Sequence, residues 1–281
     1  SALAKVLTDK DDWKLVYAAT LSLGRLDADE FLEDLESIRE THWYPPVRDI
    51  ADSAIQHIQT GKAMDEGEWW HFSIVENSPE TCEAVNYRTV DEPEGTKLYA
   101  TDDSDKLKNL SYQTAIYSYG APEGTEPNEQ GIIEVTDENI VEHVEHVQQV
   151  PDLALKVPGG WLVGADRGEG GGELVHIPTK GDSIVLYDGN VEDIFPLGDQ
   201  IVATAGLAHM VSNRGVLLRI DEAESGRFTA TQWKRLPGAP ASSWLIEGNE
   251  LLVNTYGGGS IVVDGDGTMR MAECAPEQTS E

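Results

Sequence analysis

The chain has 281 residues, enough for one large or two ordinary domains, and 40% of them are hydrophobic, as in folded globular proteins. Its 51 acidic residues outnumber the 20 basic ones, giving a formal net charge of −31. That charge argues against binding nucleic acids or anionic membrane surfaces, because Lys and Arg side chains bind both. No apolar run approaches the roughly 18 residues of a membrane span.

The excess of negative charge has two interpretations. Spread evenly over a surface, it keeps a protein soluble, also at high salt. Concentrated on a contact surface, it attracts a basic partner, because complementary charge raises the rate of encounter. We therefore expect either a structural scaffold with an acidic solubilising surface or a surface that binds a basic protein.

Residues 1–62 have the apolar periodicity of α-helices. Asp11 or Asp12 is expected to cap a first helix that ends at Gly24, and a second helix follows it. A third helix, which begins at two prolines, is expected to end at Gly61. Its apolar residues recur at helical spacing: Val47, Ile50, Ala51, Ala54, Ile55 and Ile58.

The segments YAATLSLGRL (17–26) and PPVRDIADSAIQHI (45–58) together resemble a HEAT-type helical repeat. Their alanines have a physical reason, because small side chains let the helices of successive pairs approach closely. One such unit cannot bury its apolar face alone. The resemblance therefore implies a HEAT-like segment over 1–66 that docks on the rest of the chain or belongs to a longer array.

From Glu68 onward the apolar period changes to two, which is typical of strands. The clearest copies of a repeat are GDQIVATAG…RGVLLRID (198–221) and GNELLVNTYGGGSIVVDGDG (248–267). Each has a Gly turn, an apolar run, a Gly-bearing gap and a second apolar run that ends in Asp. Five units of this kind are expected, at about 68–108, 110–150, 155–193, 194–238 and 239–275.

Units of this length, with three or four short strands each, resemble the blades of PQQ- or WD-type β-propellers. The expected fold class is mainly β with an N-terminal α-helical segment. In full, HEAT-like helices precede a five-unit antiparallel β-propeller-like domain (67–275), and a polar tail (276–281) follows. An irregular β-sandwich, or an incomplete propeller closed by the helices, is the alternative.

The two cysteines lie far apart, Cys82 in the first unit and Cys274 after the last. A disulfide between them would close the ring and contribute on the order of 3–5 kcal/mol. Two unpaired thiols are the alternative. A disulfide would place the protein in the periplasm or outside the cell, whereas free thiols fit the cytoplasm.

Metal and cofactor motifs are weak in this sequence. His143 and His146 would point to opposite faces of a strand, so we do not expect them to share a metal ion. Asp264 and Asp266 lack the closing Glu of a calcium loop, and an Asp-Gly hairpin turn explains them more simply. We therefore expect no metal and no cofactor.

The loops between strands are the candidate contact surface. The Gly-rich segment ADRGEGGGE (165–173) lacks the Lys-Ser/Thr of a P-loop and is expected to be mobile. A catalytic set of His209, Asp166 and Arg214 would need a convergence that the sequence does not indicate. The residues expected to contact a partner are Asp166, Arg167, Glu169, Glu173, His209, Arg214 and Tyr256.

Both resemblances imply scaffolds that commonly bind other proteins. Together with the charge, they predict a non-enzymatic acidic protein-binding module without a cofactor. One such role is that of an immunity or inhibitor protein that neutralises a basic, toxin-like partner. The alternatives are a small-ligand sensor or enzyme that uses a propeller pore, and the acidic scaffold.

Overall fold

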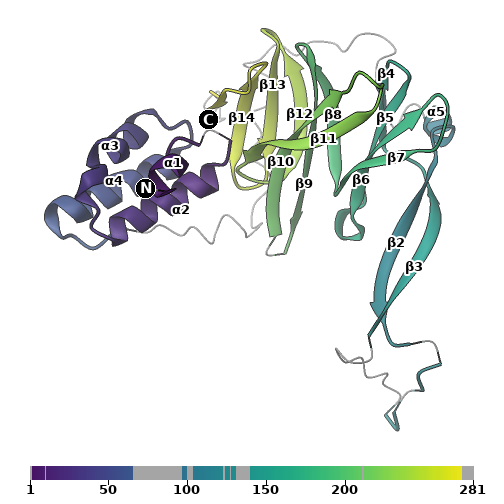
Figure 1. The fold of residues 1–281 in the computed structure, drawn as a ribbon, viewed down its shortest axis with the longest axis horizontal. Helices are drawn as coiled ribbons and strands as arrows, with labels where there is room; N and C mark the ends of the chain where they lie inside the picture. The colour runs from purple at the N-terminus through teal and green to yellow at the C-terminus, as the bar shows by residue number, and fades with distance from the viewer. Residues whose placement is uncertain are drawn as a thin grey trace, which may run out of the picture.

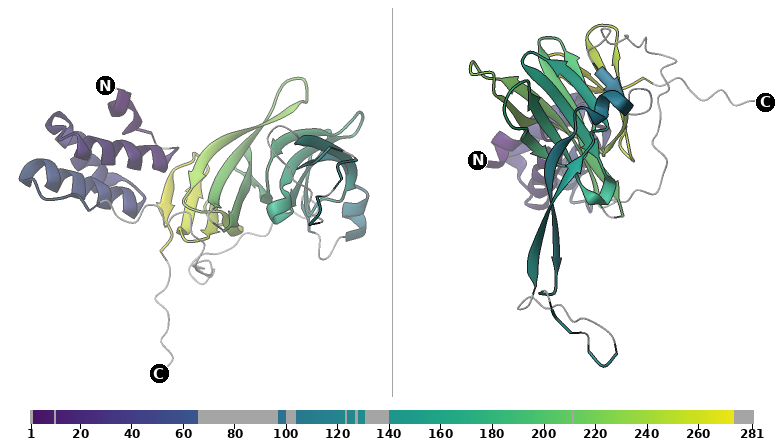
Figure 2. Two further views of the ribbon diagram at one scale, coloured as in Figure 1. Left: turned by 90° about the horizontal axis from the view of Figure 1, so that it is seen from below. Right: turned by 90° about the vertical axis from the view of Figure 1, so that its right-hand side faces the viewer.

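The computed structural model describes residues 2–9, 11–65, 97–99, 104–122, 124–126, 128–130, 140–210 and 212–273. In this part of the chain, helices lie at one end, antiparallel sheets stand side by side in the middle, and a long hairpin projects at the other end (Figures 1 and 2). The expected class, mainly β with N-terminal helices, is confirmed. Cys82, Cys274 and the polar tail lie outside the described residues, so the disulfide stays a prediction.

The helical segment begins and ends where local signals predict. It consists of α1 (Ala2–Val6), α2 (Trp13–Arg25), the 3-10 helix η1 (Asp29–Phe31), α3 (Leu32–Thr41) and α4 (Pro45–Thr60). The Asp12 carboxylate caps α2 by accepting hydrogen bonds from the backbone N–H groups of Lys14 and Leu15, at 3.1 and 3.3 Å. Gly61 ends α4 in the left-handed conformation, with a φ of +69°.

Gly24 has a different role from the predicted one. It does not end the first helix, which continues to Arg25. A Cβ atom at Gly24 would lie 2.8 Å from the Cβ of Ala54 in α4 and 2.6 Å from the Sδ of Met64. The glycine therefore allows α2 and α4 to approach closely, which is a packing requirement that the sequence pattern does not separate from a helix end.

Three sheets follow the chain order, and every neighbouring pair of strands in them is antiparallel. The first contains β4 (Leu153–Val157), β5 (Gly160–Asp166), β6 (Gly172–Pro178) and β7 (Ile184–Asp188), and β1 (Lys97–Tyr99) pairs with β4 at its edge. The second contains β8 (Val191–Leu197), β9 (Gln200–His209), β10 (Ser212–Glu222) and β11 (Phe228–Leu236). The third contains β12 (Pro240–Ile246), β13 (Glu250–Thr255), β14 (Gly259–Asp264) and β15 (Met269–Met271).

These sheets match three of the five predicted units, those at 155–193, 194–238 and 239–275. In the unit predicted at 110–150, residues 123, 127 and 131–139 lie outside the described part of the chain, and the described residues do not show a sheet of three or four strands. They form a two-stranded hairpin of β2 (Tyr112–Gly120) and β3 (Val141–Gln149), preceded by the short helix α5 (Ser104–Lys108). Most of the unit at 68–108 lies outside the described residues, and the sheets that are described do not close into a ring.

Apolar side chains fill the space between neighbouring sheets. Alternate residues of each strand point into these two layers, because successive side chains of a strand face opposite ways. Between the first and second sheets the buried residues include Leu155, Leu162, Leu174, Val191, Ala203, Leu218 and Phe228. Between the second and third sheets they include Leu197, Val202, Leu217, Leu251, Val253 and Ile261.

The helices dock on the sheets through the end of β11, as expected for a helical unit that cannot bury its own face. The indole Nε1 of Trp13 donates a hydrogen bond to the backbone oxygen of Leu236 at 3.3 Å, in a buried position. Two ion pairs flank it: Asp11 Oδ1 lies 2.5 Å from Lys234 Nζ, and Asp12 Oδ2 lies 2.8 Å from Arg235 Nε. Local capping and long-range docking thus use neighbouring residues.

Candidate functional site

The structure brings the turns that carry the predicted contact residues together at one end of the strands, along one side of the three stacked sheets. These turns join β5 to β6, β9 to β10 and β13 to β14, and each connects the second and third strands of the series β4–β7, β8–β11 and β12–β15. Glu169 Oε1 of the first turn lies 2.8 Å from His209 Nε2 of the second. Asn213 Nδ2 beside the second turn donates to the backbone oxygen of Tyr256 in the third, at 2.7 Å. We call this surface the loop edge (residues 165–173, 208–210, 212–214 and 255–259).

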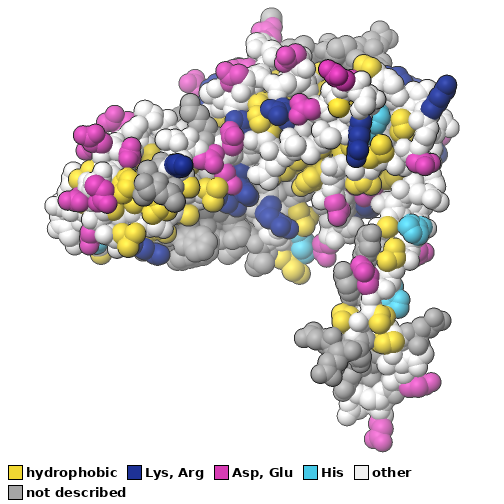
Figure 3. Space-filling model, viewed as in Figure 1, with side chains coloured by type: hydrophobic (Ala, Val, Ile, Leu, Met, Phe, Trp, Pro, Cys, Tyr) yellow, Lys and Arg dark blue, Asp and Glu magenta, His cyan; other side chains and the backbone are white. Residues whose placement is uncertain are grey.

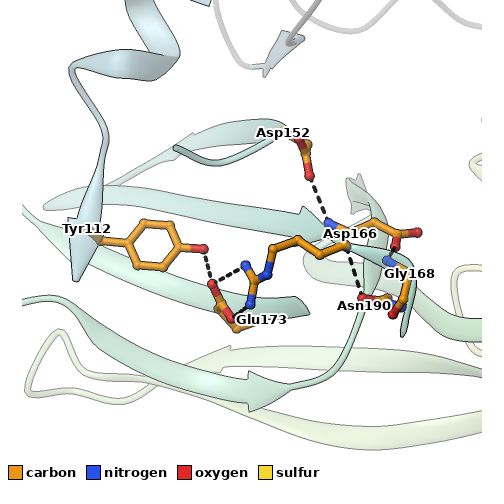
Figure 4. Close-up of polar contacts among 7 residues, drawn as sticks. Tyr112, Asp152, Asp166, Gly168, Glu173 and Asn190 are labelled. Carbon is orange, nitrogen blue, oxygen red and sulfur yellow. Dashed lines mark hydrogen bonds and ion pairs between the residues drawn. The ribbon is translucent and has the colours of Figure 1, made fainter. Parts of the chain in front are cut away.

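Hydrogen bonds hold the Gly-rich turn of the loop edge, which the sequence predicted to be mobile. Its backbone forms a short 3-10 turn, η4 (Gly168–Gly170). The backbone N–H of Gly168 donates to the Asp166 carboxylate at 2.8 Å, and that of Asp166 donates to the Asp152 carboxylate at the same distance (Figure 4). Asn190 Nδ2 donates to the backbone oxygen of Gly168 at 2.7 Å. The turn is thus braced from two neighbouring connections.

A buried carboxylate lies beneath this turn. Glu173, with only 4% of its surface exposed, accepts hydrogen bonds from Arg167 Nη1 at 2.8 Å and Nη2 at 2.5 Å, and from the Tyr112 hydroxyl (Figure 4). Burial alone would raise the pKa of Glu173, but the hydrogen bonds from Arg167 and Tyr112 and the charge of Arg167 together lower it. Glu173 and Arg167 therefore hold the turn from inside.

The side chains that remain open to solvent at the loop edge are acidic, basic and apolar. Asp166, Glu169 and Arg214 are exposed, and Met210 at the tip of the β9–β10 turn is 76% exposed with a φ of +49°. In the described chain, no hydrogen bond or ion pair joins any two of His209, Asp166 and Arg214. Direct contacts therefore do not join these three residues into a catalytic set.

Three residues could not be identified from the sequence: one lies in the loop edge, and two form hydrogen bonds that hold it. Met210 gave a weak signal, an apolar residue at a polar turn, but its exposure cannot be read from the sequence. Asn190 and Tyr112 gave no signal, because their partners lie 22 and 61 residues away along the chain. Long-range side-chain contacts of this kind depend on how the sheets stack.

A cleft of about 640 Å³ lies where the helices meet the sheets. Its walls include Asp11, Trp43, Lys234 and Asp266, together with His42, whose pKa burial lowers to about 4. The Lys234 ammonium is nearly buried and already paired with Asp11. The cleft is lined by His42, by this ion pair and by the carboxylates of Asp9 and Asp266, and we interpret it as part of the docking contact.

The predicted turn and strand settings of the possible metal ligands are confirmed. His143 and His146 lie on β3 three residues apart, which places them on opposite faces of the hairpin. Asp264 and Asp266 form the turn between β14 and β15, where both carboxylates accept the backbone N–H of Thr268, at 2.8 and 2.9 Å. Among the described residues, no group of three or more His, Cys, Asp and Glu side chains could hold a metal ion.

His176 is a buried histidine in the layer between the first and second sheets. Its ring packs edge-on against Phe228, with 4.6 Å between ring centroids, and neither ring nitrogen has a hydrogen-bond partner in the described part of the chain. Burial lowers the pKa of His176, against a smaller opposing effect of Glu222. The unfolded chain therefore binds a proton more readily, and stability is lost as the pH falls below the ordinary histidine value of 6.5.

Replacing His176 by Leu is expected to stabilise the protein by about 1 kcal/mol at neutral pH, because it removes a buried polar group without partners. The gain should grow as the pH is lowered to about 5, since protonation then costs only the wild type stability. Denaturant unfolding at several pH values measures both effects. His146→Gln, at an exposed position, is the control. A gain that is absent, or that does not grow with acidity, would contradict this account.

No protein-family model, no curated protein and no solved structure matches this chain. No relative therefore confirms the HEAT-type or propeller resemblance of the sequence or assigns an activity. In the described part of the chain, no helix is both long and apolar enough to cross a membrane.

Proposed function

We propose that this protein is a non-enzymatic binding module for a basic protein, and that the loop edge is its contact surface. An immunity or inhibitor role, in which it neutralises a basic, toxin-like partner, is the concrete form of this proposal. The observation that carries it is the convergence of three turns at one edge, where Glu169 of one turn pairs with His209 of the next, beside the exposed Met210. The chain's charge of −31 favours a partner of opposite sign.

Met210 is the central contact in this proposal. Exposed methionines suit binding surfaces, because the flexible thioether adapts to the shape of a partner. Binding energy commonly concentrates in a few such anchors within a ring of polar contacts. Asp166 and Glu169 supply these contacts, and the braced backbone of their turn reduces the entropy lost on binding.

The sheet stack supports the proposal as a rigid scaffold. We further propose that the three sheets are blades of a propeller-like domain and that the helices are of HEAT type. The second sheet contains strands β8 to β11 and the third contains β12 to β15. In each sheet the four strands lie side by side in chain order, which is the strand order of a propeller blade. In such an arrangement the turns of successive blades present one continuous surface.

A capture experiment tests the proposal. Immobilised full-length protein should retain one basic protein from an extract of the source organism at low salt, and less of it as salt screens the charges. The variant Asp166→Asn/Glu169→Gln/Met210→Ala should retain roughly tenfold less. Asn at position 166 keeps the oxygen that accepts from Gly168, so the turn is preserved.

Asp34→Asn/Glu36→Gln is the matched control, because it removes the same charge from the exposed face of α3. Equal loss of the partner in both variants would show that only net charge matters. Retention of no basic protein at either salt concentration would contradict the proposal. In that case, a stability that rises steeply with molar salt would favour an acidic solubilising surface.

A further inference from the structure

The hairpin of β2 and β3, which we call the arm, projects from the sheets (Figure 1 and Figure 2, right). Its strands pair in register over nine residues, from Tyr112 opposite Gln149 to Gly120 opposite Val141. Tyr112 at its base is buried, and its hydroxyl bonds to Glu173. The arm is therefore anchored to the sheets at its base.

The arm exposes both of its faces. The five consecutive residues 142–146 of β3 are all exposed, and successive residues of a strand face opposite ways. Val144 is 48% exposed, and Ile140 just before β3 is 43% exposed. A two-stranded hairpin without a covered face is only marginally stable in water. Among the described residues, no further strand pairs with the arm, so it offers strand edges and exposed apolar side chains.

The arm has one sign of charge. Residues 109–151 contain no Lys or Arg, whereas the chain as a whole has 20. On the visible face, the projecting part shows acidic and histidine side chains but no Lys or Arg (Figure 3). Its described charged side chains are those of Glu126, Glu129, Glu142 and Glu145. Like charges on two arms repel, so the charge disfavours pairing with a second copy of this chain.

The arm and the loop edge lie next to each other. Glu173 links them, because it bonds both Tyr112 at the base of the arm and Arg167 in the loop edge. The arm leaves the stack on the side where the β9–β10 turn lies and continues past it (Figure 1). The arm and the loop edge therefore lie close together, and a protein bound to the loop edge would contact the arm.

We propose that the arm is a second part of the binding surface, beside the loop edge, and inserts into a basic groove of the same partner protein. This inference rests on the proposed function and adds that the partner has a Lys- and Arg-lined groove. The Glu side chains would pair with these cations, Val144 would pack in the groove, and the open strand edges would bond its backbone.

Photo-crosslinking in the full chain tests this inference. The probe is p-benzoylphenylalanine, introduced singly at Val144 in the arm, at Met210 in the loop edge or at Leu26, which is 68% exposed beside the helices. Irradiation in an extract of the source organism should join one and the same basic protein to positions 144 and 210, but not to position 26. Mass spectrometry of the joined peptides should place position 144 beside Lys or Arg residues.

A charge reversal adds a quantitative outcome. Glu142→Lys/Glu145→Lys should weaken binding of the purified partner roughly tenfold or more, and Asp34→Lys/Glu36→Lys should weaken it less. Circular dichroism of both variants should match the wild type, because these four residues are exposed.

The other outcomes separate the two proposals. Crosslinks at position 210 alone, with no effect of the arm reversal, would overturn the role of the arm and leave the proposed function standing. A crosslink from position 144 to a second copy of this chain would also overturn the role of the arm. The absence of any crosslinked basic protein at either position would overturn both proposals.

Discussion

Replacing Glu173 by Ala is expected to lower the free energy of unfolding by about 3 kcal/mol. The change removes the carboxylate that accepts two hydrogen bonds from Arg167 and one from Tyr112. It leaves a partly buried guanidinium and a buried phenol without their partner, and that desolvation cost is the main part of the loss. Guanidinium unfolding at about pH 7 measures it.

The neighbouring ion pair provides the control. Glu169 pairs with His209, but the Glu169 side chain is 70% exposed. Glu169→Gln should therefore cost less than about 1 kcal/mol. If the two variants lost equal stability, Glu173 would not hold the loop edge from inside. A Tyr112→Phe variant, which keeps the ring and removes the hydroxyl, should fall between them.

The acid sensitivity of Glu173 has a defined sign. Since its pKa in the folded chain lies below the ordinary value of 4.5, the carboxylate contributes stability that is fully present above that value. This contribution is lost as the pH falls through the lowered pKa. The wild type should consequently lose more stability than Glu173→Ala when the pH is lowered from about 6 to about 3.

Replacing Trp13 by Ala is expected to cost about 3–5 kcal/mol and to loosen the helices from the sheets. The indole is 2% exposed, packs edge-on against Tyr44 with 4.7 Å between ring centroids, and donates to Leu236. Its removal leaves a cavity at the contact where Asp11 and Asp12 also bind β11. The unfolding transition should become less cooperative, because helices and sheets then unfold more independently.

Leu15→Ala tests whether this loss comes from the docking contact. Leu15 lies on the same helix but is 49% exposed, so its truncation should change stability by less than about 0.5 kcal/mol. Calorimetry of both variants gives the comparison. A Trp13→Ala variant that unfolds in one transition with nearly wild-type stability would contradict the described docking.

The helices and strands could be predicted from local signals, but which strands pair with one another could not. Asp12 begins α2 and Gly61 ends α4 through contacts within one turn, and the Gly-spaced apolar runs after residue 155 mark strands correctly. The unit at 110–150 has the same pattern, but its described residues form a two-stranded hairpin. An apolar run separated by a turn predicts a pair of strands, and it does not say whether further strands join the pair.

The site could be predicted as a set of turns but not as a surface. Turn chemistry placed Asp166, Glu169 and His209 in loops, and sheet stacking brings those loops together. Glu173 follows the same Gly-rich segment, yet its side chain is buried by a tyrosine 61 residues away. Exposure within a Gly-rich turn depends on such distant partners, so sequence alone could not separate the contact residues from their supports.

The dissociation constant of the captured basic partner tests the central claim most directly. It should be measured for the wild type, for Asp166→Asn/Glu169→Gln/Met210→Ala and for Asp34→Asn/Glu36→Gln at two salt concentrations. We predict binding that weakens with salt, a roughly tenfold loss in the loop-edge variant, and a much smaller loss in the control. Equal affinity of all three proteins for the partner would contradict the assignment of the loop edge as its binding surface.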